Sequence, residues 1–199
     1  MNRKITFILM ALMLLGIRGL SVSAQDFSLS AGGGLTLGNS FFTGRWKTSS
    51  DSYKNNELGI GAFGFFDATY AELSAGYKFV FQIDEDGYED QNKSSINIGL
   101  LGKYPFDMGH FALYPLLGVQ YMIITSINDV WFDDLSDHNA LWILIGGGGD
   151  YLISDALFIR GQVLWGYMIN SEYQKDNSYY VSYLTHGPGI KIALGYKFW

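Results

Sequence analysis

The residues best suited to hydrolytic chemistry lie in one polar segment, where Ser136 and His138 are close to carboxylates. A hydrolase needs a nucleophile within hydrogen-bond reach of a base, and a third group has to orient that base. Either Asp134 or Asp137 could complete such a set. The segment has no strand or helix periodicity, so no regular element holds these side chains in a fixed relation. We therefore assign no catalytic residue and expect a protein that is not an enzyme.

Carboxylates gather in two polar segments, residues 84–94 and 125–139. They are Asp84, Glu85, Asp86, Glu89, Asp90, Asp129, Asp133, Asp134 and Asp137. Calcium prefers several carboxylate oxygens. The first segment does not follow the EF-hand spacing, because Tyr88 stands where a ligand is required. Charged loops are ordinarily hydrated surface, so we expect no metal site and no cofactor.

Charge and composition narrow the class of partner. The formal net charge is −6, and this acidic balance argues against nucleic acid as a partner. The chain has no cysteine, which removes disulfides and cysteine-based metal sites. Residues 1–24 follow the pattern of an export signal, with Arg3 and Lys4 before an apolar run and small residues at the expected cleavage site. We expect residues 1–24 to be a signal peptide and residues 25–199 to form one domain.

The clearest element that could position side chains is residues 69–83, where two kinds of residue alternate. The small or apolar set is Thr69, Ala71, Leu73, Ala75, Tyr77, Phe79, Phe81 and Ile83. Most residues between them are polar, and successive side chains of a strand point to opposite faces. The alternation is longer than in most half-buried soluble strands. It is long enough for a tilted strand to cross a bilayer, which takes roughly 9 to 11 residues.

Seven other segments show related patterns. The expected strands are residues 27–37, 58–66, 69–83, 95–104, 110–124, 140–151, 157–169 and 189–198. Long polar loops (38–56, 84–94, 125–139, 170–186) alternate with short turns (67–68, 105–109, 153–155). Bacterial outer membrane barrels have an even strand number, short turns at one end and longer loops at the other. The pattern predicts an all-β fold, an eight-stranded antiparallel up-and-down transmembrane β-barrel in the bacterial outer membrane.

Aromatic residues on the expected apolar face fall into two groups. Near the short turns are Phe27, Phe66, Tyr104, Phe111, Tyr151, Tyr196 and Phe198, and near the long loops are Phe79, Phe81, Tyr121, Trp165 and Tyr167. Aromatic girdles are typical of the two membrane interfaces. Two groups from one register indicate that the apolar face contacts lipid.

Bulky and polar residues occupy the expected inner face. They are Tyr70, Glu72, Lys78, Lys103, Tyr114, Gln120, Trp142, Arg160, Lys191 and Lys197. An eight-stranded barrel has an interior just wide enough for side chains to fill, so we expect no open pore. Glu72 and Arg160 lie at similar heights on the third and seventh strands, which predicts an ion pair across the lumen. Because a buried charge is costly unless paired, we assign a structural role to these groups. The polar plug that we predict consists of Glu72, Lys78, Lys103, Gln120, Arg160 and Lys191.

An alternative use of the lumen is open at this point. Several inward residues are aromatic, namely Phe63, Phe65, Tyr114, Trp142 and Phe158. They could line a conduit or binding pocket for small hydrophobic molecules instead of filling the barrel. We favour filling, because small barrels ordinarily occupy their interiors with side chains.

The whole chain after residue 24 resembles a known family. The export pattern, the alternating segments, the loop rhythm and the ending Gly195-Tyr196-Lys197-Phe198-Trp199 are similar to small OmpA/OmpX-type outer membrane β-barrels, with OmpW-like barrels as a second choice. The resemblance implies contact with outer membrane lipids and lipopolysaccharide. It also implies that the barrel-assembly machinery recognises the terminal strand, which we assign to Leu194, Tyr196 and Phe198.

The resemblance further implies a structural or adhesive role. The long loops carry aromatic residues that could contact a host surface or other envelope components. Lipid A deacylase barrels, a less favoured alternative, hold their base and nucleophile in a His-x-Ser sequence on a strand, and this sequence contains none.

Overall fold

The computed structural model describes residues 28–46, 52–83, 92–128, 135, 139–169, 172–175 and 179–198. The predicted signal peptide, residues 1–24, lies outside the described residues. The strands are β1 (Leu29–Trp46), β2 (Ser52–Ala68), β3 (Ala71–Gln82), β4 (Lys93–Lys103), β5 (Phe106–Asp107), β6 (Phe111–Ile127), β7 (Ala140–Leu152), β8 (Leu157–Met168), β9 (Glu172–Lys175) and β10 (Tyr179–Lys197).

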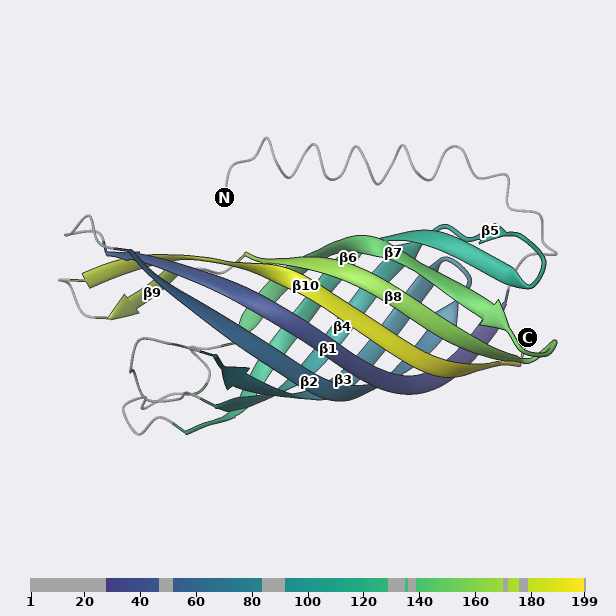
Figure 1. Cartoon of the computed structure of the whole chain (residues 1–199), viewed down its shortest axis with the longest axis horizontal. Helices are drawn as coiled ribbons and strands as arrows, with labels where there is room; N and C mark the ends of the chain where they lie inside the picture. The colour runs from purple at the N-terminus through teal and green to yellow at the C-terminus, as the bar shows by residue number, and fades with distance from the viewer. Residues whose placement is uncertain are drawn as a thin grey trace.

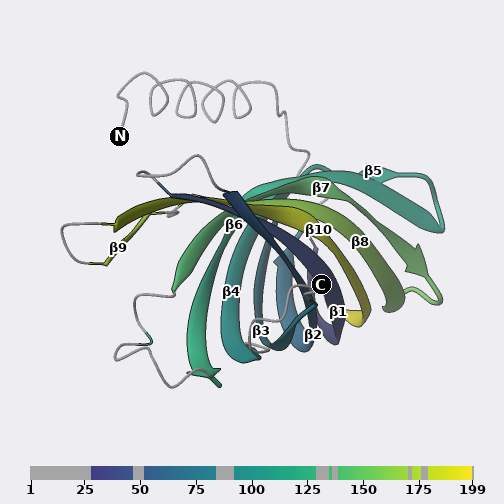
Figure 2. The same ribbon diagram turned by 60° about the vertical axis from the view of Figure 1, so that its left-hand side comes forward.

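The strands close into a barrel (Figure 1). Every pairing is antiparallel, and the sheet order is β1-β2-β3-β4-β6-β7-β8-β10. The sheet closes because β1 also pairs with β10, from Ser30 opposite Lys197 to Trp46 opposite Val181. The short strands β5 and β9 extend the hairpins of β6 and β10. Figure 2 shows the strands curving round a common axis. The predicted eight-stranded antiparallel barrel is confirmed.

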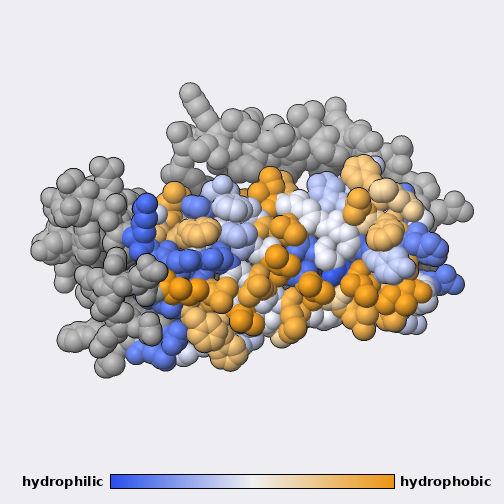
Figure 3. Space-filling view, in the orientation of Figure 1, coloured by the Kyte–Doolittle hydropathy of each residue, from blue (hydrophilic) through white to orange (hydrophobic). Residues whose placement is uncertain are grey.

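The apolar rows face outward and the polar rows face inward. In β3 exposed and less exposed residues alternate along most of the strand, with Leu73 exposed and Glu72 fully buried. Leu117 and Ile192 on other strands are also exposed, whereas Arg160 is buried. Hydrophobic side chains cover much of the outer surface of the barrel on the side seen in Figure 3. The molecule therefore has the exterior of a protein surrounded by lipid, because the residues that a soluble fold would bury are the ones exposed.

The predicted aromatic groups lie on the outside. Their members among the described residues are exposed, and Phe27 lies outside the described residues. Near the short turns, neighbouring rings contact each other across strands, with ring centroids 4.8 Å apart for Phe111 and Tyr151 and 6.1 Å apart for Phe66 and Phe198. Phe111 and Tyr151 are opposite each other on paired strands, whereas Phe66 and Phe198 meet across β1. Aromatic pairs at these distances add to stability beyond their buried area.

Two predicted loops are largely strand. The sequence predicts no regular structure for residues 38–56, but β1 continues to Trp46, and the β1–β2 pairing extends to Arg45 opposite Ser52. Residues 170–186 contain β9 and the beginning of β10, paired from Tyr179 opposite Lys175. A hairpin that extends beyond the apolar band can be polar on both faces, so its sequence loses the alternation by which strands are recognised.

One predicted turn is displaced. The sequence predicts it at residues 67–68, but β2 runs through Ala68 and the turn comprises Thr69 and Tyr70. Thr69 has a φ of 41°, in the left-handed region that a threonine rarely adopts. The threonine side chain helps to hold this conformation, since its Oγ1 accepts a hydrogen bond of 2.6 Å from the Ser28 amide. This shift carries Asp67 from the turn into the barrel.

Candidate functional site: the barrel lumen

The lumen has two unlike halves. The end at which β2 turns into β3 and β7 into β8 is called the short-turn end, and the opposite end is called the long-loop end. Charged side chains cross the lumen near the short-turn end, whereas the half toward the long-loop end encloses a cavity of about 330 Å³. The two halves meet near Lys191, which is buried and lines the cavity.

Arg160 is the centre of the charged half. It projects from β8 and is 1% exposed. Its Nη1 lies 2.8 Å from Glu72 Oε2, and its Nη2 lies 2.5 Å from Asp67 Oδ2. Its Nε and Nη2 also donate two hydrogen bonds, of 2.8 and 2.6 Å, to the carboxylate of Asp150. A guanidinium suits this position because its planar fork carries five donors and can bind a carboxylate through two of them.

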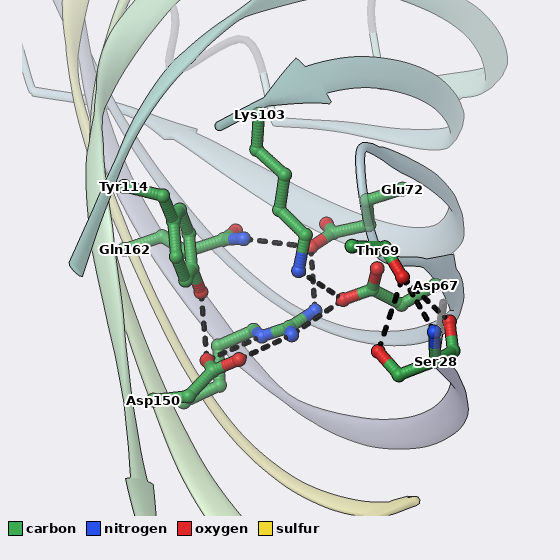
Figure 4. Close-up of polar contacts among 9 residues, drawn as sticks. Ser28, Asp67, Thr69, Glu72, Lys103, Tyr114, Asp150 and Gln162 are labelled. Carbon is green, nitrogen blue, oxygen red and sulfur yellow. Dashed lines mark hydrogen bonds and ion pairs between the residues drawn. The ribbon is translucent and has the colours of Figure 1, made fainter. Parts of the chain in front are cut away.

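Three further side chains complete the network. Lys103 pairs with Asp67, Tyr114 donates a 2.7 Å hydrogen bond from its hydroxyl to Asp150, and Gln162 donates one of 2.7 Å to Glu72. Figure 4 shows these side chains converging from strands on different sides of the lumen. We call Asp67, Glu72, Lys103, Tyr114, Asp150, Arg160 and Gln162 the lumen network. It draws members from β2, β3, β4, β6, β7 and β8.

Aromatic rings cover the network on its apolar side. The guanidinium carbon of Arg160 lies 4.5 Å from the ring centroid of Phe65 and 5.1 Å from that of Phe158. Phe63, Phe65, Phe158 and Ala193 form one buried cluster, with Leu152 packed against it. These rings pack beside the charges, so the predicted inward aromatics Phe65 and Phe158 fill the lumen at this level. A cation held between ring faces and carboxylates is well stabilised away from water.

The predicted plug residues do not form one group. The expected pair of Glu72 and Arg160 is present, and Lys103 belongs to the same network. Lys191 is buried beside them, where its Nζ lies 3.4 Å from Ser74 Oγ. Two other members lie farther toward the long-loop end and line the cavity, namely Lys78 and Gln120.

Two residues predicted to face inward are placed differently. Lys197 is exposed at the end of β10. Tyr70 lies in the β2–β3 turn, where its ring centroid is 6.1 Å from that of Tyr104. Both positions lie at strand ends, where the barrel wall no longer separates an inner from an outer side.

Sequence reasoning missed two aspartates that contact Arg160 directly. Asp67 falls in the predicted turn, and Asp150 follows four glycines that obscure the periodicity of β7. The inward position of Asp67 could have been predicted, because Asp67 and the inward residues Phe63 and Phe65 are alternate residues of one strand. The position of Asp150 could have been predicted from the strand pairing, since Asp150 stands opposite Arg160 in the β7–β8 ladder.

The cavity begins where the network ends. Its lining includes Phe63, Ser74 and Lys191 near the network and Asn39, Asn55 and Glu57 toward the long-loop end. Among the charged groups that line it, Lys93 Nζ lies 2.5 Å from Glu57 Oε1. Gln120 donates a 3.0 Å hydrogen bond to Asn97 Oδ1. The volume falls at the lower end of the range of small-molecule pockets, about 300–1,000 Å³.

The residues first considered for hydrolysis and for calcium binding fall in segments that the structure does not describe. Ser136 and His138 are outside the described residues, as are all nine carboxylates of the two acidic segments. Within the part of the chain that the structure describes, no group of three or more histidine, aspartate or glutamate side chains could hold a metal ion. Among the same residues, no helix is long and apolar enough to cross a membrane.

Comparison with known proteins identifies the architecture. No protein-family model matches the sequence, and no curated protein matches it. The outer membrane protein OprG from Pseudomonas aeruginosa is similar in structure, with a TM-score of 0.50 and 14% identity over 87% of this chain and 96% of that one. The fold is that of a small outer membrane β-barrel.

Other barrels align over similar lengths. A major outer membrane protein from Thermus thermophilus gives a TM-score of 0.45 at 14% identity, covering 84% of this chain and 99% of that one. The outer membrane protease OmpT from Escherichia coli gives 0.37 at 11% identity, covering 89% and 99%. At such identities, likeness to a solved structure establishes the fold alone.

Proposed function

We propose that this chain is a non-enzymatic integral outer membrane protein with no open pore and with a structural or surface-interaction role. The observation that carries the proposal is the lumen network, which joins side chains from strands on different sides of the barrel at the short-turn end. Ions or solutes that cross the barrel would have to displace Arg160 from three carboxylates. Separating such desolvated charges is costly, because each would be left buried without a partner.

The outer surface supports the proposed location and surroundings. Exposed apolar side chains cover the strands, and exposed aromatic rings lie toward both ends. This is the arrangement by which outer membrane barrels meet acyl chains at the centre and headgroups at both interfaces. We therefore infer that outer membrane lipids and lipopolysaccharide surround the barrel. We also propose that residues 1–24 direct export and that the barrel-assembly machinery recognises Leu194, Tyr196 and Phe198 on the terminal strand.

Planar bilayer recording tests the absence of a pore. We expect no steady single-channel steps from the purified barrel, because the network occupies the lumen. The replacement Arg160→Ala removes the central cation and should introduce conductance or a noisy baseline, whereas Lys197→Ala, which changes an exposed lysine on β10, should stay silent. Steady steps from the unaltered protein would reject the sealed lumen.

Mass spectrometry of lipid A from cells with and without the protein tests the proposal that the chain is not an enzyme. A difference in the mass of lipid A would contradict it.

A second candidate function is a binding barrel, and the cavity favours it. The lumen is filled near the short-turn end, yet about 330 Å³ remains toward the long-loop end. A conduit needs a path along the whole lumen, whereas a binding site needs only a pocket. Of the two hydrophobic-molecule alternatives, the geometry therefore supports a pocket with a closed floor more than a conduit.

A further inference from the structure

The cavity has two unlike sides. Its charged residues come from the continuous run of strands from β10 through β1 to β4, with Glu57 on β2, Lys78 on β3, Lys93 on β4 and Lys191 on β10. The strands β6, β7 and β8 on the other side contribute no charged group among the described residues. Apart from Gln120 on β6, they contribute mainly apolar side chains, including Met122, Ile124, Trp142, Leu144, Leu164 and Met168. A molecule that matches both sides must have a charged end and an apolar body.

The charges do not balance within the described part of the chain. Three lysines line the cavity with one glutamate, and that glutamate is paired with Lys93 at 2.5 Å. Among the described residues, Lys191 Nζ lies 3.4 Å from Ser74 Oγ and 4.9 Å from the ring centroid of Phe63. No carboxylate of a described residue lies within 4.0 Å of Lys78 or Lys191, so Glu57 and Glu72 attract these two lysines only from a longer distance. The cavity thus carries an excess of positive charge in a chain whose formal net charge is −6. Ammonium groups held away from water are costly without a counter-charge.

The backbone is shaped to accommodate one of these lysines. Lys78 extends across β2 and β1, where glycines stand at the positions it covers. A Cβ at Gly59 would overlap Lys78 Cε, and a Cβ at Gly38 would come within 3.2 Å of Lys78 Nζ. Without side chains at these two positions, the lysine can lie along the cavity wall. Its ammonium is thereby held near Gly38 on β1, inside the cavity that Trp142 and Leu164 also line.

We propose that the cavity binds a small organic anion with an apolar body, of the class of a medium-chain carboxylate. The carboxylate would accept hydrogen bonds from Lys78 and Lys191, and the hydrocarbon would lie against Trp142, Leu144 and Leu164. This inference rests on the second candidate function, the binding barrel, and names its ligand class. The proposed ligand does not affect the proposal of a sealed lumen, because the lumen network closes the barrel on the short-turn side of Lys191 whether or not a ligand is bound.

Calorimetry with the full barrel in phospholipid nanodiscs tests the proposal. Octanoate has both a charge and a chain, octanol has only the chain and acetate has only the charge, and empty nanodiscs provide the correction for partitioning into lipid. We expect saturable binding of octanoate to the barrel, and binding of octanol and acetate that is weaker by about tenfold or more, the loss expected when a charged hydrogen bond or a buried chain is removed.

Two lysine replacements identify the site, and an exposed lysine provides the control. Lys78→Gln and Lys191→Gln should each weaken octanoate binding by about tenfold and leave octanol binding unchanged, while Lys197→Gln should change neither. Heat-modifiable migration on gels shows that each variant is folded, and if Lys191→Gln does not fold, Lys78→Gln decides. Equal binding of octanoate and octanol, or octanoate binding that Lys78→Gln leaves intact, would overturn the anion site while the binding barrel stands. No saturable binding of any of the three would reject both.

Discussion

At the residue scale, Arg160 matters more to the lumen network than any one of its carboxylates does. Asp67 has a second cation in Lys103, and Glu72 has the amide of Gln162. Arg160 is the group that joins Asp67, Glu72 and Asp150, so its removal leaves three carboxylates in the lumen with a single lysine among them. Removal of Glu72 leaves Arg160 with two carboxylates. The network should therefore respond unequally to the two losses.

This asymmetry predicts the order of two destabilisations. Arg160→Met should lower the free energy of unfolding by about 3–5 kcal/mol, the cost of breaking a buried charge pair. Glu72→Ala should lower it by less, and it should also lower the thermal unfolding temperature in detergent. Urea titration of the purified barrel measures the first quantity, with Lys197→Met as the exposed control. An unchanged unfolding temperature for Glu72→Ala would show that its pairing with Arg160 adds nothing to stability.

The network also shows how far single residues could be predicted. Glu72 and Arg160 could be paired from the sequence because both lie in clear alternation at similar heights on their strands. Asp67 and Asp150 could not, because the end of one strand was misjudged and the periodicity of the other is obscured by glycines. The excess charge of the cavity was equally invisible. It depends on which lysines and carboxylates reach the cavity, and the 36 residues that separate Glu57 from Lys93 in the sequence give no hint that these two side chains meet there.

At the scale of the element, periodicity located strands only where lipid requires it. Within the apolar band one face of each strand must be apolar, so β3 and β8 were recognised along their lengths. Beyond the band β1 and β2 continue as a paired hairpin without that requirement, and the sequence predicted a loop. The lengths of strands in such barrels are therefore underestimated at the long-loop end, because the strands pass there from lipid into water and no longer need an apolar face.

The residues that we propose as the assembly signal lie on the outer face of the terminal strand, so their role in assembly can be tested separately from stability. Leu194, Tyr196 and Phe198 are all exposed on the outer face of the barrel, and the Phe198 ring centroid lies 6.1 Å from that of Phe66. Tyr196→Ala combined with Phe198→Ala should reduce the amount of folded protein in outer membrane fractions severalfold. The expected reason is loss of the recognition strand, since exposed residues contribute little to a packed interior.

A matched change on another strand provides the control for that prediction. Phe79→Ala with Phe81→Ala also removes two exposed aromatic residues, but from β3. It should leave the membrane level nearly unchanged. Refolding of both purified double variants into detergent should give similar yields, which separates recognition in the cell from stability of the barrel. Equal membrane levels for the two double variants would argue against a special role of the terminal strand.

At the scale of the whole molecule, the fold followed from the sequence more completely than the site did. Strand number, antiparallel order and sidedness all depend on a repeated constraint, since each crossing of the bilayer must present an apolar face and pair its backbone. Errors in one strand, such as the blurred alternation of β7, are corrected by seven others. The lumen lacks such redundancy, because each of its contacts is made once.

Membrane insertion can be tested directly on the outer face of one strand. The chain has no cysteine, so single cysteines can be introduced along β8 without background labelling. Val163 is 60% exposed and Leu164 is 5% exposed, although they are adjacent. A spin label at Val163→Cys in reconstituted vesicles should collide with oxygen, which concentrates in the bilayer, and a label at Leu164→Cys should be shielded by the lumen. If a water-soluble nickel complex reaches Val163→Cys more readily than oxygen does, the apolar rows face water, and the barrel is not inserted as its surface indicates.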